Sequence, residues 1–107
     1  MELSIIGAGN VATVLGKALQ QKNHTIREVY SRTITSAARL ADYLGAKALT
    51  NLNQLDGRSD LYLLAVPDDV IPVLADQLQL GDRLLVHTAG SVSQTVLSGA
   101  SSRFGVL

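Results

Sequence analysis

Three small residues near the start of the chain have the spacing of a phosphate-binding turn. Gly7, Gly9 and Ala12 form G-x-G-x-x-A between an apolar run, residues 3–6, and a segment whose apolar residues recur at helical spacing. In a strand–turn–helix unit, the first glycine allows the tight turn and the second lets a pyrophosphate approach the backbone. The small third residue lets the helix lie close to the strand, and N–H groups at the helix start attract anions. The segment predicts dinucleotide binding; the alternative is a turn that needs glycine only for its geometry.

The residues after the second β-rich run indicate which dinucleotide would bind. Thr25–Tyr30 is followed by Ser31, Arg32 and Thr33, with no acid among them. An NAD site usually has an Asp or Glu here, about twenty residues after the turn, to accept hydrogen bonds from the adenosine ribose. A guanidinium flanked by hydroxyls instead suits a 2′-phosphate. We therefore expect Arg32 to contact NADP, rather than NAD or S-adenosylmethionine; the alternative is a solvated surface arginine.

Few other residues have a pattern that could do chemistry. His87 is the one titratable residue expected near the nicotinamide end of such a site, where it could act as an acid or proton relay. The alternative is a structural histidine at a strand end. Asp68 and Asp69 could be paired carboxylates, but they stand where a helix needs an N-cap, and we expect capping. The chain has no cysteine and two distant histidines, so we expect no metal site.

The elements that would position these residues alternate between strands and helices. Apolar or β-rich runs predict strands near residues 3–6, 25–30, 47–49, 61–66, 84–86 and 104–107. This alternation predicts an α/β fold in three layers, a doubly wound, mostly parallel sheet of the Rossmann type. The expected strand order is 3-2-1-4-5-6, in which the loops at Gly7 and Pro67 face each other across a cleft.

Helical periodicity fills the intervals between the strands. Apolar residues at helical spacing predict helices over 11–19 and 37–44, after Pro67, and in a short segment near residues 92–97. For the second helix, Thr33 or Thr35 could be the N-cap, and Gly45 is expected to end it. In the third helix, Pro72 falls in the first turn, where its missing N–H costs little.

Bulk properties exclude several classes of protein. The 107 residues form one domain, and nine basic residues balance nine acidic ones. We therefore expect neither a nucleic-acid partner nor an anionic membrane surface. The chain starts without a signal-like apolar run, and no stretch approaches the length of a membrane span. A cytoplasmic location is the expectation.

Four segments occur in this order along the chain: GAGNVA, YSRT, AVPDDVI and HTAGS. Together they make the chain resemble the N-terminal domain of proteins classed as NADP oxidoreductases, which carry a helical C-terminal domain of uncharacterised function. These are relatives of pyrroline-5-carboxylate reductase and of deazaflavin-dependent NADP reductase. The resemblance covers essentially all of residues 1–107, which would be the Rossmann-like, N-terminal part of a longer two-domain protein. It implies hydride transfer between NADP(H) and a small, imino- or keto-acid-like substrate. The alternative function is a nucleotide-sensing module without turnover.

The resemblance also implies roles for individual residues. The pyrophosphate would lie over the turn residues Gly7, Ala8, Gly9, Asn10 and Val11. The adenosine phosphate would contact Ser31, Arg32 and Thr33, and the nicotinamide ribose would be lined by Ala65, Val66 and Pro67. Family members often have Ser where this chain has Ala89. The helical domain would close the site and form a homodimer. We therefore expect residues 1–107 alone to bind the cofactor without catalysing.

Overall fold

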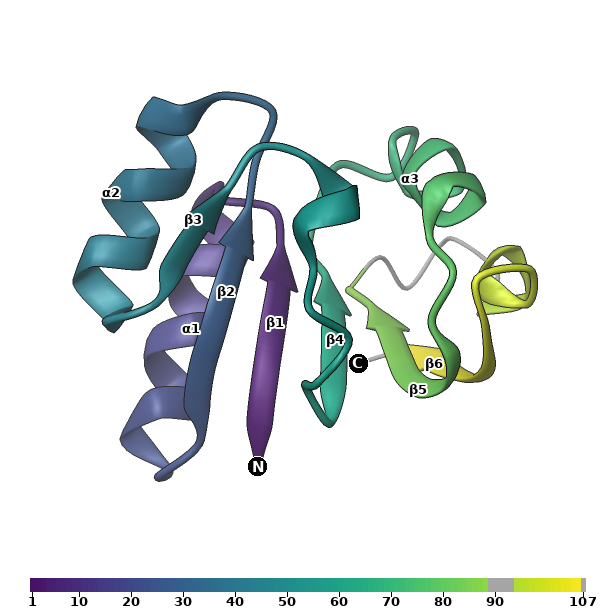
Figure 1. The fold of residues 1–107 in the computed structure, drawn as a ribbon, viewed down its shortest axis with the longest axis horizontal. Coiled ribbons are helices and arrows are strands. Elements are labelled where there is room, and N and C mark those ends of the chain that lie inside the picture. Colours follow the sequence, from purple (N-terminus) through teal and green to yellow (C-terminus); the bar gives the residue numbers. More distant parts are fainter. Residues whose placement is uncertain (89–93, 107) are drawn as a thin grey trace.

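The sheet has the predicted order and direction. A computed structural model describes residues 1–88 and 94–106, and in this part of the chain six strands pair in the order β3-β2-β1-β4-β5-β6. All of the pairings are parallel. The strands, side by side in Figure 1, are β1 (Glu2–Ile6), β2 (Thr25–Tyr30), β3 (Lys47–Leu49), β4 (Leu61–Leu64), β5 (Gly81–His87) and β6 (Ser101–Val106). The prediction of a doubly wound α/β fold is confirmed.

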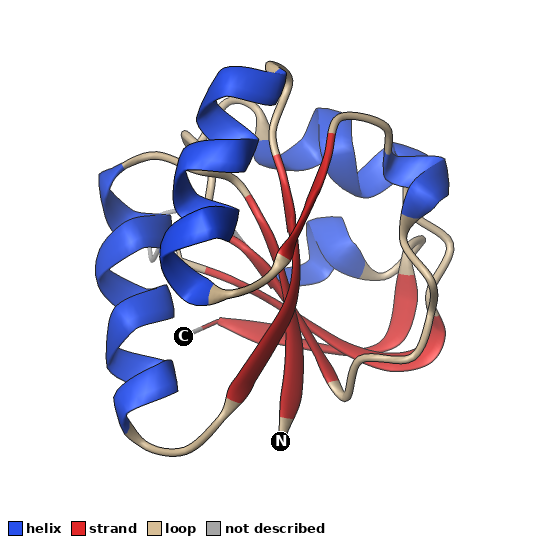
Figure 2. Cartoon of the chain, turned by 60° about the vertical axis from the view of Figure 1, so that its left-hand side comes forward, coloured by secondary structure: helices blue, strands red, loops and turns tan. Residues whose placement is uncertain are grey.

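Helices cover both faces of the sheet, as Figure 2 shows with the sheet seen nearly edge-on. Two long helices, α1 (Asn10–Gln21) and α2 (Ile34–Leu44), pack on one face. The other face is covered by α3 (Ile71–Gln77) and by the short 3₁₀ helices η1 (Leu52–Gln54) and η2 (Gln94–Leu97). None of the helices in the described part of the chain is long and apolar enough to cross a membrane.

The two-sided cover explains why the central strands β1 and β4 consist mostly of buried apolar residues. Alternate residues of a strand point to opposite faces. Thus Leu3 and Ile5 of β1 pack against α1 and α2, whereas Ile6 packs on the side of α3. Each of these three side chains is fully buried. Because neither face meets water, the strands show no alternation between apolar and polar residues.

The ends of α2 follow the sequence signals. Of the two candidate caps, Thr33 is the N-cap, and its hydroxyl accepts a hydrogen bond of 3.4 Å from the N–H of Ser36. Gly45 ends the helix with φ of 70°, in the left-handed region that glycine adopts without steric cost.

The start of α3 differs from the prediction. The helix begins at Ile71 with Val70 as its cap residue, and no side chain caps it, so the expectation that Asp68 or Asp69 would do so is wrong. The chain first makes a separate turn, closed by a 2.9 Å hydrogen bond from the N–H of Val70 to the carbonyl of Pro67. This turn moves the helix start beyond both aspartates. Pro72, in the first helical turn, also removes one of the N–H groups that a cap would satisfy.

Several element boundaries also differ from the expected ones. β4 ends at Leu64 rather than at Val66, which leaves residues 65–67 outside the strand. β5 begins at Gly81 and β6 at Ser101, each three residues earlier than the apolar run predicts. η2 corresponds to the predicted short helix, of which Val92 lies outside the described residues.

Candidate functional site

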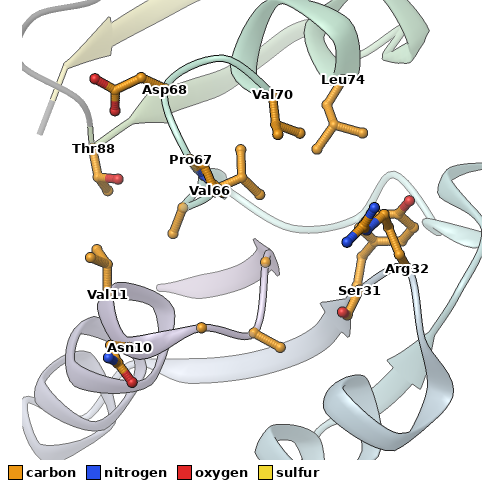
Figure 3. Close-up of a pocket in the computed structure, with 15 residues that line it drawn as sticks. Asn10, Val11, Ser31, Arg32, Val66, Pro67, Asp68, Val70, Leu74 and Thr88 are labelled. Atoms are coloured by element: carbon orange, nitrogen blue, oxygen red, sulfur yellow. The ribbon is translucent and has the colours of Figure 1, made fainter.

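A cavity of about 530 Å³ lies at the carboxyl ends of β1, β2, β4 and β5 (Figure 3). This volume is in the range of ligand-binding pockets, and its position is the switch point of the sheet, where open α/β folds bind ligands. Of the residues predicted to contact the cofactor, Thr33 does not line the cavity. The other ten do: Gly7, Ala8, Gly9, Asn10, Val11, Ser31, Arg32, Ala65, Val66 and Pro67.

Gly7 shapes the turn between β1 and α1. Its φ is 126°, and a Cβ at this position would lie 2.1 Å from the carbonyl oxygen of Ala65. Its N–H donates a 2.8 Å hydrogen bond to the carbonyl of Tyr30 at the end of β2. The loops that follow β1 and β4 therefore touch at the floor of the cavity, as the strand order predicts. Glycine is required here by the protein's own packing.

Gly9 is a glycine for which the protein's packing gives no reason. Its φ of −84° and ψ of −162° are open to any residue, and a Cβ here would meet nothing within 4 Å. Gly9 lines the cavity and is the N-cap residue of α1, without a side-chain cap. The first N–H groups of α1 and the positive end of its dipole are therefore directed at the cavity, an arrangement that favours an anion.

The adjoining end of the cavity is formed by the residues after β2. Ser31 donates its N–H to the carbonyl of Leu49 at 3.0 Å, which ties this loop to the end of β3. Ser31 and the exposed Arg32 line the cavity together with Tyr30, and no carboxylate lines it there. Thr33 instead uses its hydroxyl to cap α2.

The opposite end is formed by the loops that follow β4 and β5. The N–H of Ala65 donates a 2.9 Å hydrogen bond to the carbonyl of Ile6, and Val66, Pro67 and Asp68 then form one wall. Thr88, after β5, forms another part of this end. Sequence reasoning did not assign Asp68 and Thr88 to the site, nor the two apolar residues of the wall, Val70 and Leu74.

His87 is fully buried and is not among the residues that line the cavity. It pairs with Leu64 of β4 and with Val106 of β6, and lies on the same sheet face as Leu85. Strand alternation could have identified this, because residues two apart in a strand share a face and Leu85 belongs to the core. The following motif residues, 89–91, lie outside the described part of the chain.

An apolar hollow of about 410 Å³ adjoins the cavity along α1. The two share Asn10, Val11 and Thr88, and Val14 and Leu15 complete the hollow. The side chains of Val11 and Val14 are 52% and 65% exposed. Within the described residues, no group of three His, Asp or Glu side chains could hold a metal ion.

The parallel sheet, its switch point and the glycine turn define the class of Rossmann-like α/β domains. Residues 2–91 match the family described as NADP oxidoreductase, coenzyme F420-dependent, and the chain belongs to this family.

Solved structures share this fold. A protein from Bacteroides fragilis assigned as an NADP oxidoreductase is 37% identical, with a TM-score of 0.87 over 98% of this chain and 42% of its own. A protein from Thermotoga maritima is 31% identical, with a TM-score of 0.65 over 90% of this chain and 35% of its own. Pyrroline-5-carboxylate reductase from Streptococcus pyogenes, 20% identical, shares the fold with a TM-score of 0.78 over 94% of this chain and 38% of its own. The chain thus spans less than half the length of these relatives. No curated protein matches the sequence.

Proposed function

We propose that this chain is the NADP(H)-binding domain of an oxidoreductase that transfers hydride between NADP(H) and a small, imino- or keto-acid-like substrate. The family and the relative from Bacteroides fragilis support the NADP-linked chemistry. The relatives are more than twice as long as this chain, which supports a further domain in the whole protein. In the proposal, that domain closes the substrate side and forms the homodimer.

The observation that carries the proposal is the contrast between the two glycines of the turn. Gly7 is required by the contact with Ala65, whereas a side chain at Gly9 would enter empty space inside the cavity. A glycine that the fold does not need, at a helix start that faces a cavity, fits a ligand that must approach the backbone closely. A pyrophosphate is the anion that this arrangement recognises in dinucleotide-binding domains.

The remaining lining residues fit the other parts of the coenzyme. Arg32 and Ser31 would bind the adenosine 2′-phosphate, the guanidinium as a bidentate donor and the hydroxyl as a single one. The absence of a carboxylate at this end of the described cavity also favours the phosphate, because an acid would repel it. Val66, Pro67 and Thr88 would hold the nicotinamide riboside at the ends of β4 and β5.

The bound nicotinamide supplies or accepts the hydride, and the protein orients the ring. The residues described here bind the coenzyme and set the direction in which its ring faces. The open hollow beside Thr88 leaves one side of that ring accessible to solvent until another surface covers it. Hydride transfer requires that water be excluded and that the substrate carbon be held close to the ring. We therefore propose that residues 1–107 alone bind the coenzyme without turnover.

A second candidate, a nucleotide-sensing module without turnover, is favoured by one observation. The one histidine of the HTAGS segment is buried away from the cavity, so that the described lining contains no histidine that could move a proton. The two functions differ in whether the longer protein oxidises NADPH with any substrate.

Calorimetric titration of the chain with NADPH and NADH tests the proposal. We expect NADPH to bind the more tightly of the two, and its advantage to shrink as salt screens the phosphate contact. Tighter binding of NADH, or no binding of either coenzyme, would overturn it. Absorbance at the NADPH band, with imino acids, keto acids and aldehydes added in turn, tests the absence of turnover. Substrate-dependent oxidation by residues 1–107 would contradict that part.

A further inference from the structure

The described lining of the cavity carries one cationic and one anionic side chain, and they stand at opposite ends. Arg32 lies at the end formed by β2, and Asp68 lies at the end formed by β4 and β5, beyond Pro67 (Figure 3). The other described lining side chains are uncharged. The cavity is therefore electrostatically polarised along its length.

The two charged ends of the cavity are separated by a distance that the proposed coenzyme can span. The inference therefore rests on the proposed function. From β2 to β5 the sheet order spans three strand spacings, about 14 Å at about 4.8 Å each. A dinucleotide with its 2′-phosphate at Arg32 and its pyrophosphate over Gly9 extends across β1 toward β4 and β5. Its nicotinamide end then lies in the part of the cavity that Asp68 and Thr88 line.

Asp68 does not cap α3, which is the role that the sequence predicts for it. Both aspartates precede α3, but that helix begins at Ile71 and takes no side-chain cap. Helix capping therefore does not explain a carboxylate at this end of the cavity. What distinguishes Asp68 from its neighbour Asp69 is that Asp68 lines the cavity and Asp69 does not.

The two redox forms of the coenzyme differ in charge at this end. The pyridinium ring of NADP⁺ carries a positive charge, and the dihydronicotinamide ring of NADPH is neutral. A carboxylate near the ring attracts the first and has no net charge to attract in the second. We propose that Asp68 is the residue with which this domain distinguishes the redox forms of its coenzyme, because its carboxylate favours the cationic ring of NADP⁺.

The size of the effect follows from the exposure of the side chain. Asp68 is exposed, so solvent and salt screen its field and the interaction is that of a surface ion pair. We expect removal of this charge to weaken NADP⁺ binding about threefold, within the range of exposed pairs, and to leave NADPH binding unchanged.

The experiment measures dissociation constants for NADP⁺ and NADPH with the unmodified chain and with Asp68→Asn and Asp69→Asn, at low and high salt. Asp69→Asn is the matched control, because it removes the same charge one residue away from the cavity lining. The ratio of the two constants is the readout, since loss of fold would weaken both coenzymes together. Thermal melting establishes that each variant is folded.

We expect Asp68→Asn to change this ratio about threefold at low salt and less at high salt, and Asp69→Asn to leave it unchanged. Equal weakening of both coenzymes by Asp68→Asn, an unchanged ratio, or the same change in both variants would overturn the inference while leaving coenzyme binding established. Failure of the unmodified chain to bind either coenzyme would overturn the proposed function and, with it, this inference.

Discussion

The hydroxyl of Ser4 donates a hydrogen bond of 2.6 Å to the carboxylate of Glu28, and both side chains are buried. The register of β1 and β2 places the two residues opposite each other. Leu3 pairs with Ile26 and Ser4 with Glu28, so that an irregularity at Arg27 brings the carboxylate onto the face of Ser4. The one acid of β2 is thereby held inside the sheet, below the cavity.

The same pair holds the segment before β4 against the sheet. The second carboxylate oxygen of Glu28 accepts a 3.1 Å hydrogen bond from the N–H of Asp56, and the hydroxyls of Ser4 and Ser59 are 2.7 Å apart. Because these contacts occupy Glu28, it is not available as an acceptor for a ribose at the end of β2. Glu28 therefore does not replace the acid that is missing after β2.

The first prediction concerns this buried contact. Because Glu28→Ala leaves the Ser4 hydroxyl and the Asp56 N–H without their acceptor, we expect it to lower the free energy of unfolding by about 2–4 kcal/mol. Ser4→Ala should cost about 1.5–3 kcal/mol, and the double variant less than the sum of the two. Urea unfolding of the single and double variants measures this coupling. Glu2→Gln, which changes an exposed acid, is the control. Additive losses of unfolding free energy in the double variant, or an equally large loss in Glu2→Gln, would contradict the role of this contact.

The second prediction is a pH dependence at Asp56. The N–H of Arg58 donates to this carboxylate at 3.0 Å and Arg27 pairs with it, and both lower the pKa of Asp56 from its ordinary 3.8. A lowered folded-state pKa means that the stabilisation is present above pH 3.8 and is lost as the pH falls through the folded-state value. Asp56→Asn should therefore reduce the acid dependence of the melting temperature below about pH 4. If the melting temperature of Asp56→Asn falls with decreasing pH as steeply as that of the unmodified chain, the folded state does not stabilise this carboxylate.

A third prediction separates the two glycines of the turn. Gly9→Val places its side chain in the open cavity, so we expect a native-like circular dichroism spectrum and loss of NADPH binding. Gly7→Ala meets the carbonyl of Ala65 with φ at 126°, and we expect it to lower the free energy of unfolding by more than about 3 kcal/mol. Preserved NADPH binding in a folded Gly9→Val chain would count against a pyrophosphate at this turn.

The fourth prediction concerns coenzyme choice. Arg32→Ala should weaken NADPH binding by about 1.5–3 kcal/mol, the range for a charged hydrogen bond, and leave NADH binding nearly unchanged. Arg39→Ala is the control, because Arg39 is also exposed, lies on α2 and does not line the cavity. Calorimetry with both coenzymes measures the difference. Equal losses for NADPH and NADH in Arg32→Ala would contradict a contact with the 2′-phosphate.

Much of the fold and most of the cavity lining were predictable because both depend on local patterns. The run of residues 3–6, the glycines and the helical spacing after them define a strand–turn–helix unit whatever surrounds it. Repeated strand–helix units with short connections then restrict the sheet to a parallel, doubly wound order. Once that order is known, the carboxyl ends of β1, β2 and β4 must meet, and the loops at Gly7, Arg32 and Pro67 must share a cavity.

Only the tertiary structure decided what individual side chains do at those ends. Asp68 and Asp69 were expected to cap α3, but the turn after Pro67 moved the helix start and left Asp68 at the cavity. Thr33 caps α2 instead of lining the cavity, and His87 is buried while Thr88 reaches the site. These outcomes depend on where each strand and turn ends, to within a single residue. Periodicity averages over several residues and therefore predicts the element, whereas packing against neighbouring elements decides the direction of its last side chains.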